Sequence, residues 1–201
     1  MNLEKIISLN PKRILDIGAN IGQFHQAIKT WLPDSFIYSI EANPLCISEL
    51  IKVTNEYKIC LLGNETKHIN FYTNISNPIS TGASYYKENT EHFCDDNLLT
   101  LSLKMVRLDD LNLEPFDFVK IDTQGSELDI IKGGINLIKK AKHLLIEATT
   151  KGCYNLGSPC GDDVLEYLWK EGFKELDSLS YEEHNNVIQE DILFKNIRLT
   201  L

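Results

Sequence analysis

Long apolar runs are missing from this sequence of 201 residues, and so is any excess of basic residues. No stretch reaches the roughly 18 consecutive apolar residues that a membrane-spanning helix needs. The 20 Lys and Arg residues are outnumbered by 29 Asp and Glu residues, which gives a formal net charge of −9. Because a protein that binds duplex DNA neutralises phosphates with a basic face, this charge argues against nucleic-acid partners.

Two further absences concern export and cysteine chemistry. The first seven residues show no basic end followed by a long apolar region, so we expect no secretory signal and a cytoplasmic protein. The five cysteines are odd in number and form no Cys-x-x-Cys pair. We therefore expect free thiols rather than disulfides or a metal site.

The sequence contains 43% hydrophobic and 24% charged residues, without repeats or low-complexity tracts. This composition predicts one soluble globular domain over residues 1–201. Short apolar runs predict strands at residues 14–17, 36–40, 58–62, 69–72, 101–108, 116–121, 144–146, 173–176 and 192–197. Helical patterns lie between several of them, at residues 21–31, 45–53, 127–138 and 162–170.

Strands that alternate with helices predict an α/β fold with a mostly parallel, doubly wound sheet. The last two predicted strands are separated only by polar residues 177–191, which we interpret as a loop that joins an antiparallel hairpin at the sheet edge. Residues 73–100 are also mostly polar and carry turn signals. Such a long stretch inside a compact domain predicts a functional loop or lid insertion.

Ligands of open α/β sheets bind beyond the carboxyl ends of the strands. The first predicted strand leads into residues 16–22, where Gly18 permits a tight turn and the following helix offers free N–H groups. Glu41 follows the second strand roughly 20 residues later, at the spacing of a carboxylate that binds a ribose diol. Together these features predict a cofactor that contains a nucleoside.

The glycine pattern distinguishes between two such cofactors. A dinucleotide site requires Gly-x-Gly-x-x-Gly, and the corresponding residues here are Gly18, Asn20 and Gln23. Asp16 would also repel a diphosphate. S-adenosylmethionine carries a sulfonium, an ammonium and a ribose but no phosphate, so the charges favour it over NAD.

Asp122 and Glu147 follow two strands that we expect to be neighbours. Two carboxylates there could hold a substrate hydroxyl, take its proton or share a cation. Helix capping by Asp122 and structural hydrogen bonding by Glu147 remain alternatives, and His25 and His92 are weaker candidates for the base. Since no third firm ligand is evident, we predict no metal site and treat a metal-assisted reaction as a minor alternative.

Five segments, in order along the chain, resemble the FkbM-type methyltransferases. They are residues 14–22 (Ile-Leu-Asp-Ile-Gly-Ala-Asn-Ile-Gly), 41–44 (Glu-Ala-Asn-Pro), 106–111, 120–127 (Lys-Ile-Asp-Thr-Gln-Gly-Ser-Glu) and 191–194. The resemblance implies a Rossmann-like class I methyltransferase fold, S-adenosylmethionine as cofactor, and methyl transfer to a hydroxyl oxygen.

The resemblance also implies roles for individual residues. Those expected at the cofactor are Asp16, Gly18, Ala19, Asn20 and Gly22 in the first turn, Glu41 at the ribose, Ala42 with Gly63 and Asn64 beside the adenine, and Asp122 at the reacting centre. Those expected at the acceptor are Ser84, His92 and Gln124. Gln124 departs from the family pattern, which commonly has Glu there.

We therefore expect an S-adenosylmethionine-dependent O-methyltransferase whose acceptor is a hydroxyl of a small molecule or of a sugar or glycan unit. An NAD-dependent oxidoreductase and a non-catalytic cofactor-binding domain are the alternatives. A nucleic-acid methyltransferase is disfavoured by the acidic charge, and no Asp/Asn-Pro-Pro-Tyr-like segment follows the fourth strand, where an amino-methylating enzyme would need one.

Overall fold

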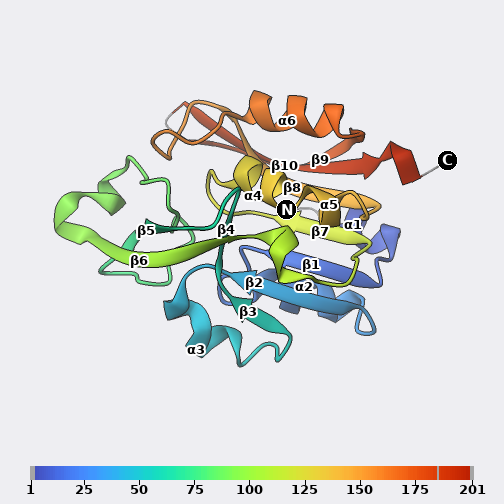
Figure 1. The fold of residues 1–201 in the computed structure, drawn as a ribbon, viewed down its shortest axis with the longest axis horizontal. Coiled ribbons are helices and arrows are strands. Elements are labelled where there is room, and N and C mark those ends of the chain that lie inside the picture. Colours follow the sequence, from blue (N-terminus) through green and yellow to red (C-terminus); the bar gives the residue numbers. More distant parts are fainter. Residues whose placement is uncertain (1–2, 185, 200–201) are drawn as a thin grey trace.

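The computed structural model describes residues 3–184 and 186–199. Of the start of the chain considered above, Met1 and Asn2 lie outside this range. Seven strands form one sheet in the order β3-β2-β1-β7-β8-β10-β9 (Figure 1). Their bounds are β1 Arg13–Ile17, β2 Phe36–Glu41, β3 Tyr57–Ile59, β7 Phe118–Ile121, β8 His143–Lys151, β9 Phe173–His184 and β10 Val187–Asn196.

Strand directions confirm the mostly parallel sheet with an antiparallel hairpin at its C-terminal edge. β3, β2, β1, β7 and β8 pair in parallel, whereas β10 runs antiparallel to both β8 and β9. The carboxyl ends of β1, β2 and β7 consequently meet at one edge, where the predicted ligand site lies.

The single strand predicted at residues 58–62 is wrong, because the chain changes sheets at Cys60. β3 pairs with β2 at the edge of the large sheet, and β4, Leu61–Gly63, pairs with a different strand, β6. β4, β6 (Leu98–Arg107) and β5 (Lys67–Asn74) form a second sheet in the order β4-β6-β5. The two short strands are distinct because β3 and β4 pair with different strands. The hydrophobicity of residues 58–62 does not reveal these partners.

The loop predicted at residues 177–191 is also wrong within the described range. β9 and β10 extend through it, with Val187 paired to His184. β9 is an edge strand, and most of its residues are exposed. Its polar sequence therefore resembles a loop, although its backbone pairs with β10. β8 likewise continues beyond Glu147 to Lys151, because β10 pairs with it that far.

Helices cover both faces of the large sheet. α1 (Leu3–Leu9), which the sequence did not predict, lies with α2 (Gln23–Trp31) against one face, and their Ile6 and Ile28 join one core cluster. The opposite face is covered by α4 (Glu127–Gly133), α5 (Ile135–Ile138) and α6 (Gly161–Lys170).

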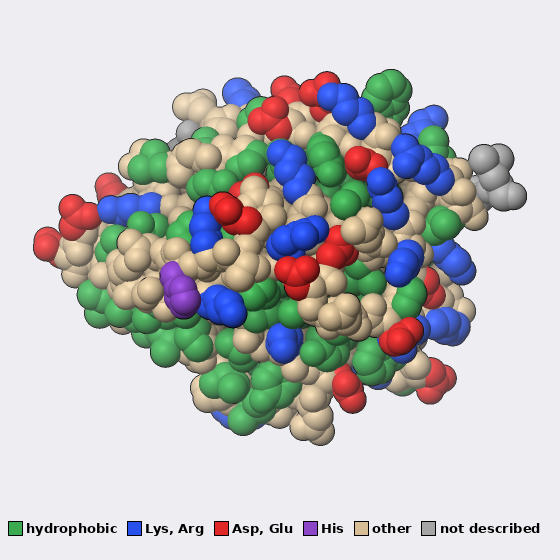
Figure 2. Space-filling view, in the orientation of Figure 1, with side chains coloured by type: hydrophobic (Ala, Val, Ile, Leu, Met, Phe, Trp, Pro, Cys, Tyr) green, Lys and Arg blue, Asp and Glu red, His purple; other side chains and the backbone are tan. Residues whose placement is uncertain are grey.

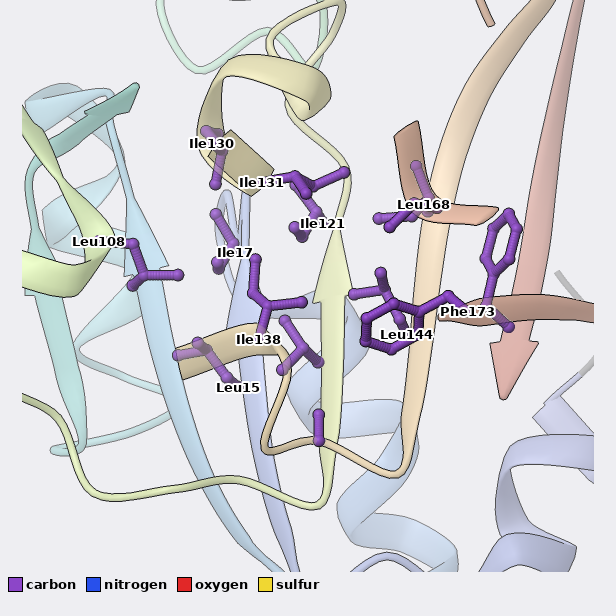
Figure 3. Packing of buried hydrophobic residues seen from close by; sticks show 14 of the residues in the cluster. Leu15, Ile17, Leu108, Ile121, Ile130, Ile131, Ile138, Leu144, Leu168 and Phe173 are labelled. Carbon is purple, nitrogen blue, oxygen red and sulfur yellow. The ribbon is translucent and has the colours of Figure 1, made fainter. Parts of the chain in front are cut away.

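The larger core cluster lies between these helices and the sheet. Leu15, Ile17 and Ile121 of the strands pack under Ile131 and Ile138 of the helices (Figure 3). Each fully buried aliphatic side chain of this kind stabilises the fold by roughly 1.5–3 kcal/mol. The floor of the site at the strand ends is therefore rigid.

Two predicted helices are shorter or interrupted. The helix expected at residues 45–53 is a 3-10 turn, Pro44–Cys46, followed by α3, Ile47–Leu50, although Asn43 caps it as predicted by accepting from Leu45 N–H at 3.1 Å. The helix expected over residues 127–138 breaks at Gly134. A Cβ at Gly134 would lie 2.5 Å from Leu108, so the chain turns there to pack closely.

Residues 75–97 connect β5 to β6 and contain only 3-10 turns at Glu91–Phe93 and Asp95–Asn97 and isolated bridges. The irregular middle of the stretch predicted at residues 73–100 is thus confirmed, while its two ends belong to β5 and β6. We call residues 75–97 the cover segment. Within the described parts of the chain, no helix is long and apolar enough to cross a membrane.

Candidate functional site

A cavity of about 320 Å³ opens at the carboxyl ends of β1, β2 and β7. Its volume falls within the range of small-molecule sites, and its position is the one where doubly wound sheets bind ligands. Its wall includes eight of the predicted residues, which are Gly18, Ala19, Asn20, Glu41, Ala42, Ser84, Asp122 and Gln124.

Position 18 must be a glycine because the backbone that follows β7 passes too close to leave room for a side chain. The φ of Gly18 is +80°, and a Cβ would lie 1.8 Å from the backbone oxygen of Asp122. Gly22 has a different role, since it precedes α2 with φ +88° and a Cβ there would lie 2.8 Å from Val53. Gly22 therefore serves packing of the helix start, outside the cavity wall.

Glu41 is buried at the end of β2, and both of its oxygens are held by the backbone. Oε2 accepts from Asn20 N–H and Oε1 from Asn43 N–H, each at 2.7 Å. Burial raises the pKa of Glu41 and the backbone hydrogen bonds oppose that rise. A carboxylate has about four acceptor positions, so Glu41 retains capacity to accept from a ligand in the cavity.

Asp16 and Lys120 form a buried pair behind this wall. They are register partners on β1 and β7, and Lys120 Nζ lies 3.6 Å from Asp16 Oδ1. Neither Asp16 oxygen has a hydrogen-bond partner among the residues that the structure describes, and burial raises the pKa of Asp16. Unlike Lys120, Asp16 is not a wall residue, so the structure places it beside the cavity rather than in it.

Asp122 stands on the cavity wall with both oxygens held. Lys120 Nζ lies 3.0 Å from Oδ2, and the Gln124 amide donates to Oδ1 at 3.4 Å. The same Gln124 amide donates to Glu147 Oε2 at 2.5 Å. Asp122 and Glu147 are thus close, as predicted, but an amide connects them and only Asp122 reaches the cavity.

Glu147 lies behind Gln124 at the point where β8 passes the site. Burial raises the pKa of Glu147 well above its ordinary value, and repulsion from Asp122, Glu127 and Asp191 adds to this rise. Gln189 donates a second, longer hydrogen bond to Glu147 Oε2 at 3.4 Å. Glu147 is therefore protonated more readily than an ordinary glutamate, which suits a group that holds a proton near Asp122.

Glu127 shapes the turn that follows Asp122. Its Oε1 accepts from Thr123 N–H at 2.8 Å, from the Thr123 hydroxyl at 3.0 Å and from Gly125 N–H at 3.2 Å. These bonds hold Gln124 and Gly125 in left-handed conformations, with φ +54° and +95°. Glu127 thus binds backbone groups of the turn before α4, and no side-chain hydrogen bond caps the start of this helix, so the capping role considered for Asp122 is wrong.

The cover segment is tied to the cavity by side chains that donate to its carbonyl groups. Asn20 Nδ2 donates to Ile79 O at 3.1 Å, and Asn43 Nδ2 donates to Pro78 O at 2.7 Å. Thr73 Oγ1 also donates to Pro78 O, at 2.9 Å. These bonds bring Ser80, Thr81 and Ser84 to the cavity wall.

A groove of about 1000 Å³ adjoins the cavity and shares Ser80, Thr81 and Gln124 with it. Its other walls come from the cover segment, the loop after β8 and the β9–β10 hairpin. They include His92, Tyr154, Glu182 and Gln189. Asn155 Nδ2 donates to Tyr86 O at 2.9 Å, which joins the first two of these walls.

A model of the FkbM methyltransferase domain matches residues 16–175. The chain belongs to this family. No curated protein matches the chain.

Solved methyltransferase structures share the fold of this FkbM-family chain at low sequence identity. An FkbM methyltransferase from Methylobacillus flagellatus is 18% identical, with a TM-score of 0.54 over 90% of this chain and 44% of that one. Magnesium protoporphyrin IX methyltransferase from Synechocystis PCC 6803 with bound SAM is 10% identical, with a TM-score of 0.54 over 96% and 77%. A putative RNA methyltransferase from Pyrococcus horikoshii is 10% identical, with a TM-score of 0.51 over 97% and 79%.

These likenesses establish the Rossmann-like class I methyltransferase fold. The FkbM-family chain spans less than half the length of the Methylobacillus protein.

Besides Asp16, Gly22 and Glu147, four more predicted residues of the FkbM-family chain are not on the cavity wall. Gly63 packs against Met105, and Asn64 donates to Asp129 at 2.8 Å. Of the turn expected beside the adenine, residues 62–64, only Leu62 lines the cavity, together with Cys60 and Leu61. His25 is buried 3.4 Å from Ser39 Oγ and its pKa is lowered by burial, while His92 lies in the groove.

Sequence reasoning missed Lys120, Thr123 and Phe24 as wall residues. A signal for Lys120 was present, because a lysine interrupts the buried apolar strand β7. Such a side chain is rarely buried without a charged partner. No group of three or more His, Cys, Asp or Glu side chains in the described residues is arranged to hold a metal ion.

Proposed function

We propose that this FkbM-family chain is an S-adenosylmethionine-dependent O-methyltransferase that acts on a hydroxyl of a small molecule or of a sugar or glycan unit. The observation that carries the proposal is Glu41, a buried carboxylate fixed by two backbone N–H groups at the carboxyl end of β2. A carboxylate there binds the diol of a ribose in nucleoside-binding α/β sheets.

The remaining residues fit the methyl donor. Ala42, Cys60 and Leu61 offer an apolar surface for the adenine next to Glu41. Asn20 and Asp122 lie where the charged methionine part would bind, with Asp16 buried nearby without a hydrogen-bond partner among the described residues. Two of the solved relatives were determined with SAM or S-adenosyl-L-methionine bound, which supports the same donor here.

A nicotinamide dinucleotide fits less well. Its diphosphate would approach the first turn, where Asn20 and Gln23 side chains line the cavity in place of glycines. Asp122 and Glu41 on the same wall would repel the phosphate charges. We therefore keep an NAD-dependent oxidoreductase as an outcome of the test below.

When bound, S-adenosylmethionine supplies an activated methyl group on its sulfonium. Asp122 is the base in this proposal, since its carboxylate is on the cavity wall and can accept the proton of the acceptor hydroxyl. Gln124 keeps Asp122 and Glu147 together, and Glu147 can hold a proton behind it. The residues of the wall mainly align the acceptor oxygen with the methyl group.

The groove next to the cavity is the proposed acceptor site. Its wall is rich in hydroxyl, amide, imidazole and carboxylate groups, which suits an acceptor with several hydroxyls. His92 and Gln124 lie there as proposed acceptor contacts, and Ser84 lies on the adjoining cavity wall. Figure 2 shows basic and acidic side chains mixed over α4, α5 and β6, so this face offers no continuous basic surface for a nucleic acid.

Binding and transfer are tested separately. Calorimetry and thermal unfolding should show binding and stabilisation by S-adenosylhomocysteine and none by NAD, because a ligand stabilises only the folded state that binds it. Methyl transfer from labelled S-adenosylmethionine is then measured on a panel of monosaccharides, oligosaccharides and small alcohols, with tRNA as a separate arm.

Each outcome decides between the candidates. Transfer to a hydroxyl of the panel supports the proposal, and transfer to tRNA alone refutes its acceptor class. Binding of S-adenosylhomocysteine without methyl transfer to the hydroxyl panel or to tRNA favours a non-catalytic cofactor-binding domain. Tight binding of NAD without binding of S-adenosylhomocysteine favours the oxidoreductase.

A further inference from the structure

Lys120 is a buried ammonium in the centre of the sheet. It belongs to β7, and 4% of it is exposed. Its Nζ lies 3.0 Å from Asp122 Oδ2 and 3.6 Å from Asp16 Oδ1, and 5.5 Å from the ring centre of Phe24 on α2. The side chain thus contacts residues of both central strands and of the helix that begins beside the cavity. β1, β7 and α2 lie next to one another in the fold (Figure 1).

The groups around Lys120 are predominantly carboxylates. Asp16 faces it from β1, Asp122 from the end of β7, and Glu147 from β8. Glu127 of α4 and Asp191 of β10 also act on this group of carboxylates. Without a cation among them, like charges so close would favour protonation or displacement of some of these carboxylates.

From this geometry we infer that Lys120 is a positioning residue of the methyl transfer, which holds the Asp122 carboxylate on the cavity wall and balances the charges of Asp16 and Glu147 behind it. Gln124 completes the arrangement by donating to the second Asp122 oxygen. Lys120 acts through Asp122 and is not itself the base. The inference concerns the same site as the proposed function and rests on it for the role of Asp122.

The electrostatics agree with this geometry. Burial lowers the pKa of Lys120, but Asp122 and Asp16 outweigh that effect and raise it above its ordinary value, so the side chain stays charged. Lys120 in turn opposes the rise in pKa that burial causes at Asp16, Glu147 and Asp191. Removing the ammonium should therefore raise the pKa values of these three carboxyl groups.

The first experiment needs neither donor nor acceptor. The titration of Glu147 is followed by carboxyl-carbon NMR in the wild type, Lys120→Met and Lys120→Arg, and the resonance is assigned by its loss in Glu147→Gln. The pKa of Glu147 should rise in Lys120→Met and return toward the wild-type value in Lys120→Arg. Lys104→Met, at an exposed strand lysine, is the matched control.

A structural role is separated by binding and stability. Lys120→Met leaves Asp16 without its cation and costs stability, so Lys120→Gln, which keeps a donor without the charge, is measured in parallel. Calorimetry with S-adenosylhomocysteine should give dissociation constants within about threefold of the wild type for variants that fold. An unchanged Glu147 titration, or an affinity loss of about 100-fold without any change in titration, would overturn the inference.

The double mutant tests the path through Asp122. With an acceptor from the panel, Lys120→Met and Asp122→Asn should each reduce kcat at least tenfold, whereas Lys120→Met in the Asp122→Asn background should reduce it little further. Additive losses would show that Lys120 acts independently of Asp122. A wild type that transfers no methyl group refutes the proposed function, while the NMR titration still decides the role of Lys120 in the carboxylate group.

Discussion

The cavity and the groove meet at Gln124, but they are built by different means. The cavity lies at the ends of paired parallel strands, and its key carboxylate, Glu41, is held by backbone N–H groups. The groove is walled by the cover segment and neighbouring loops, which are joined by side chains such as Asn155 that donate to backbone carbonyls. The proposed donor side is thus built largely from strand ends, whereas the proposed acceptor side depends on individual side chains.

If the cavity binds the donor and the groove binds the acceptor, as proposed, the acceptor could change while the donor stays the same. Altering the cavity requires changing strands that also form the core. Altering the cover segment or the loop after β8 leaves the parallel sheet intact. The following predictions test whether substitutions on the two sides separate donor binding from acceptor use.

The largest effect is expected at the boundary of the two sides. Asp122→Asn removes the proposed base but keeps an oxygen for Lys120, so kcat should fall by roughly 10²–10⁴-fold. Calorimetry should still find measurable binding of S-adenosylhomocysteine, so that the loss of turnover exceeds the loss of affinity. Asp96→Asn, at an exposed residue of the cover segment, is the control, and wild-type turnover of Asp122→Asn would rule out this base.

The second effect concerns Glu127, which accepts hydrogen bonds from backbone groups of the turn after Asp122. Burial raises the pKa of Glu127 to about 7, so folding favours its protonated form. Its contribution to stability is therefore present below the ordinary pKa and is lost as the pH rises toward 7. Glu127→Gln keeps a side-chain oxygen that can accept the three hydrogen bonds. Because glutamine does not titrate, the variant does not lose stability as the pH rises.

Glu127→Gln should consequently be more stable than the wild type at pH 8, by up to roughly 3 kcal/mol, and equally stable near pH 4. Urea unfolding across this pH range measures the difference in the free energy of unfolding. Glu114→Gln, at an exposed residue, should show no such pH dependence. A difference that does not vary with pH would contradict the buried, protonated Glu127.

The residues of the cavity are easier to predict from sequence than those of the groove, because strand ends have regular spacing. Glu41 was found because the strand–turn–helix spacing places the end of β2 at a fixed distance from Gly18. Gly63 and Asn64 were expected at the adenine from the family resemblance, whereas the structure places them outside the cavity wall. β3 ends at Ile59, so Cys60 and Leu61 are the residues that follow it at the cavity.

The acceptor side gives weaker signals. No periodicity marks a side chain that donates to a distant carbonyl, such as Asn43 to Pro78. The polar residues of β9 suggested a loop because an edge strand does not need an apolar outer face. Lys120 was quoted in a motif, but its pairing with Asp16 depends on the β1–β7 register, which the sequence does not specify.

A third, smaller effect tests the donor side alone. Glu41→Gln removes the charge that would strengthen hydrogen bonds from ribose hydroxyls, and such bonds contribute roughly 1.5–3 kcal/mol. The dissociation constant for S-adenosylhomocysteine should rise about 10- to 100-fold. Glu56→Gln, at an exposed residue before β3, is the control, and an unchanged dissociation constant would remove Glu41 from the donor site.

The smallest effect tests the cover segment, which lines the groove and also part of the cavity. The Tyr85 and Tyr86 hydroxyls both donate to Asp129 Oδ2 at 2.8 Å, which ties the cover segment to α4. Tyr86→Phe removes one of these bonds at a cost of about 1 kcal/mol, while Tyr85 still holds the segment. Hydrogen exchange should therefore become faster over residues 84–90 with no change in affinity for S-adenosylhomocysteine, and Tyr57→Phe in β3 should leave that exchange unaltered. If Tyr86→Phe weakened donor binding as much as it loosened the cover segment, the two sides would not be separable, and acceptor specificity could not change independently of the donor site.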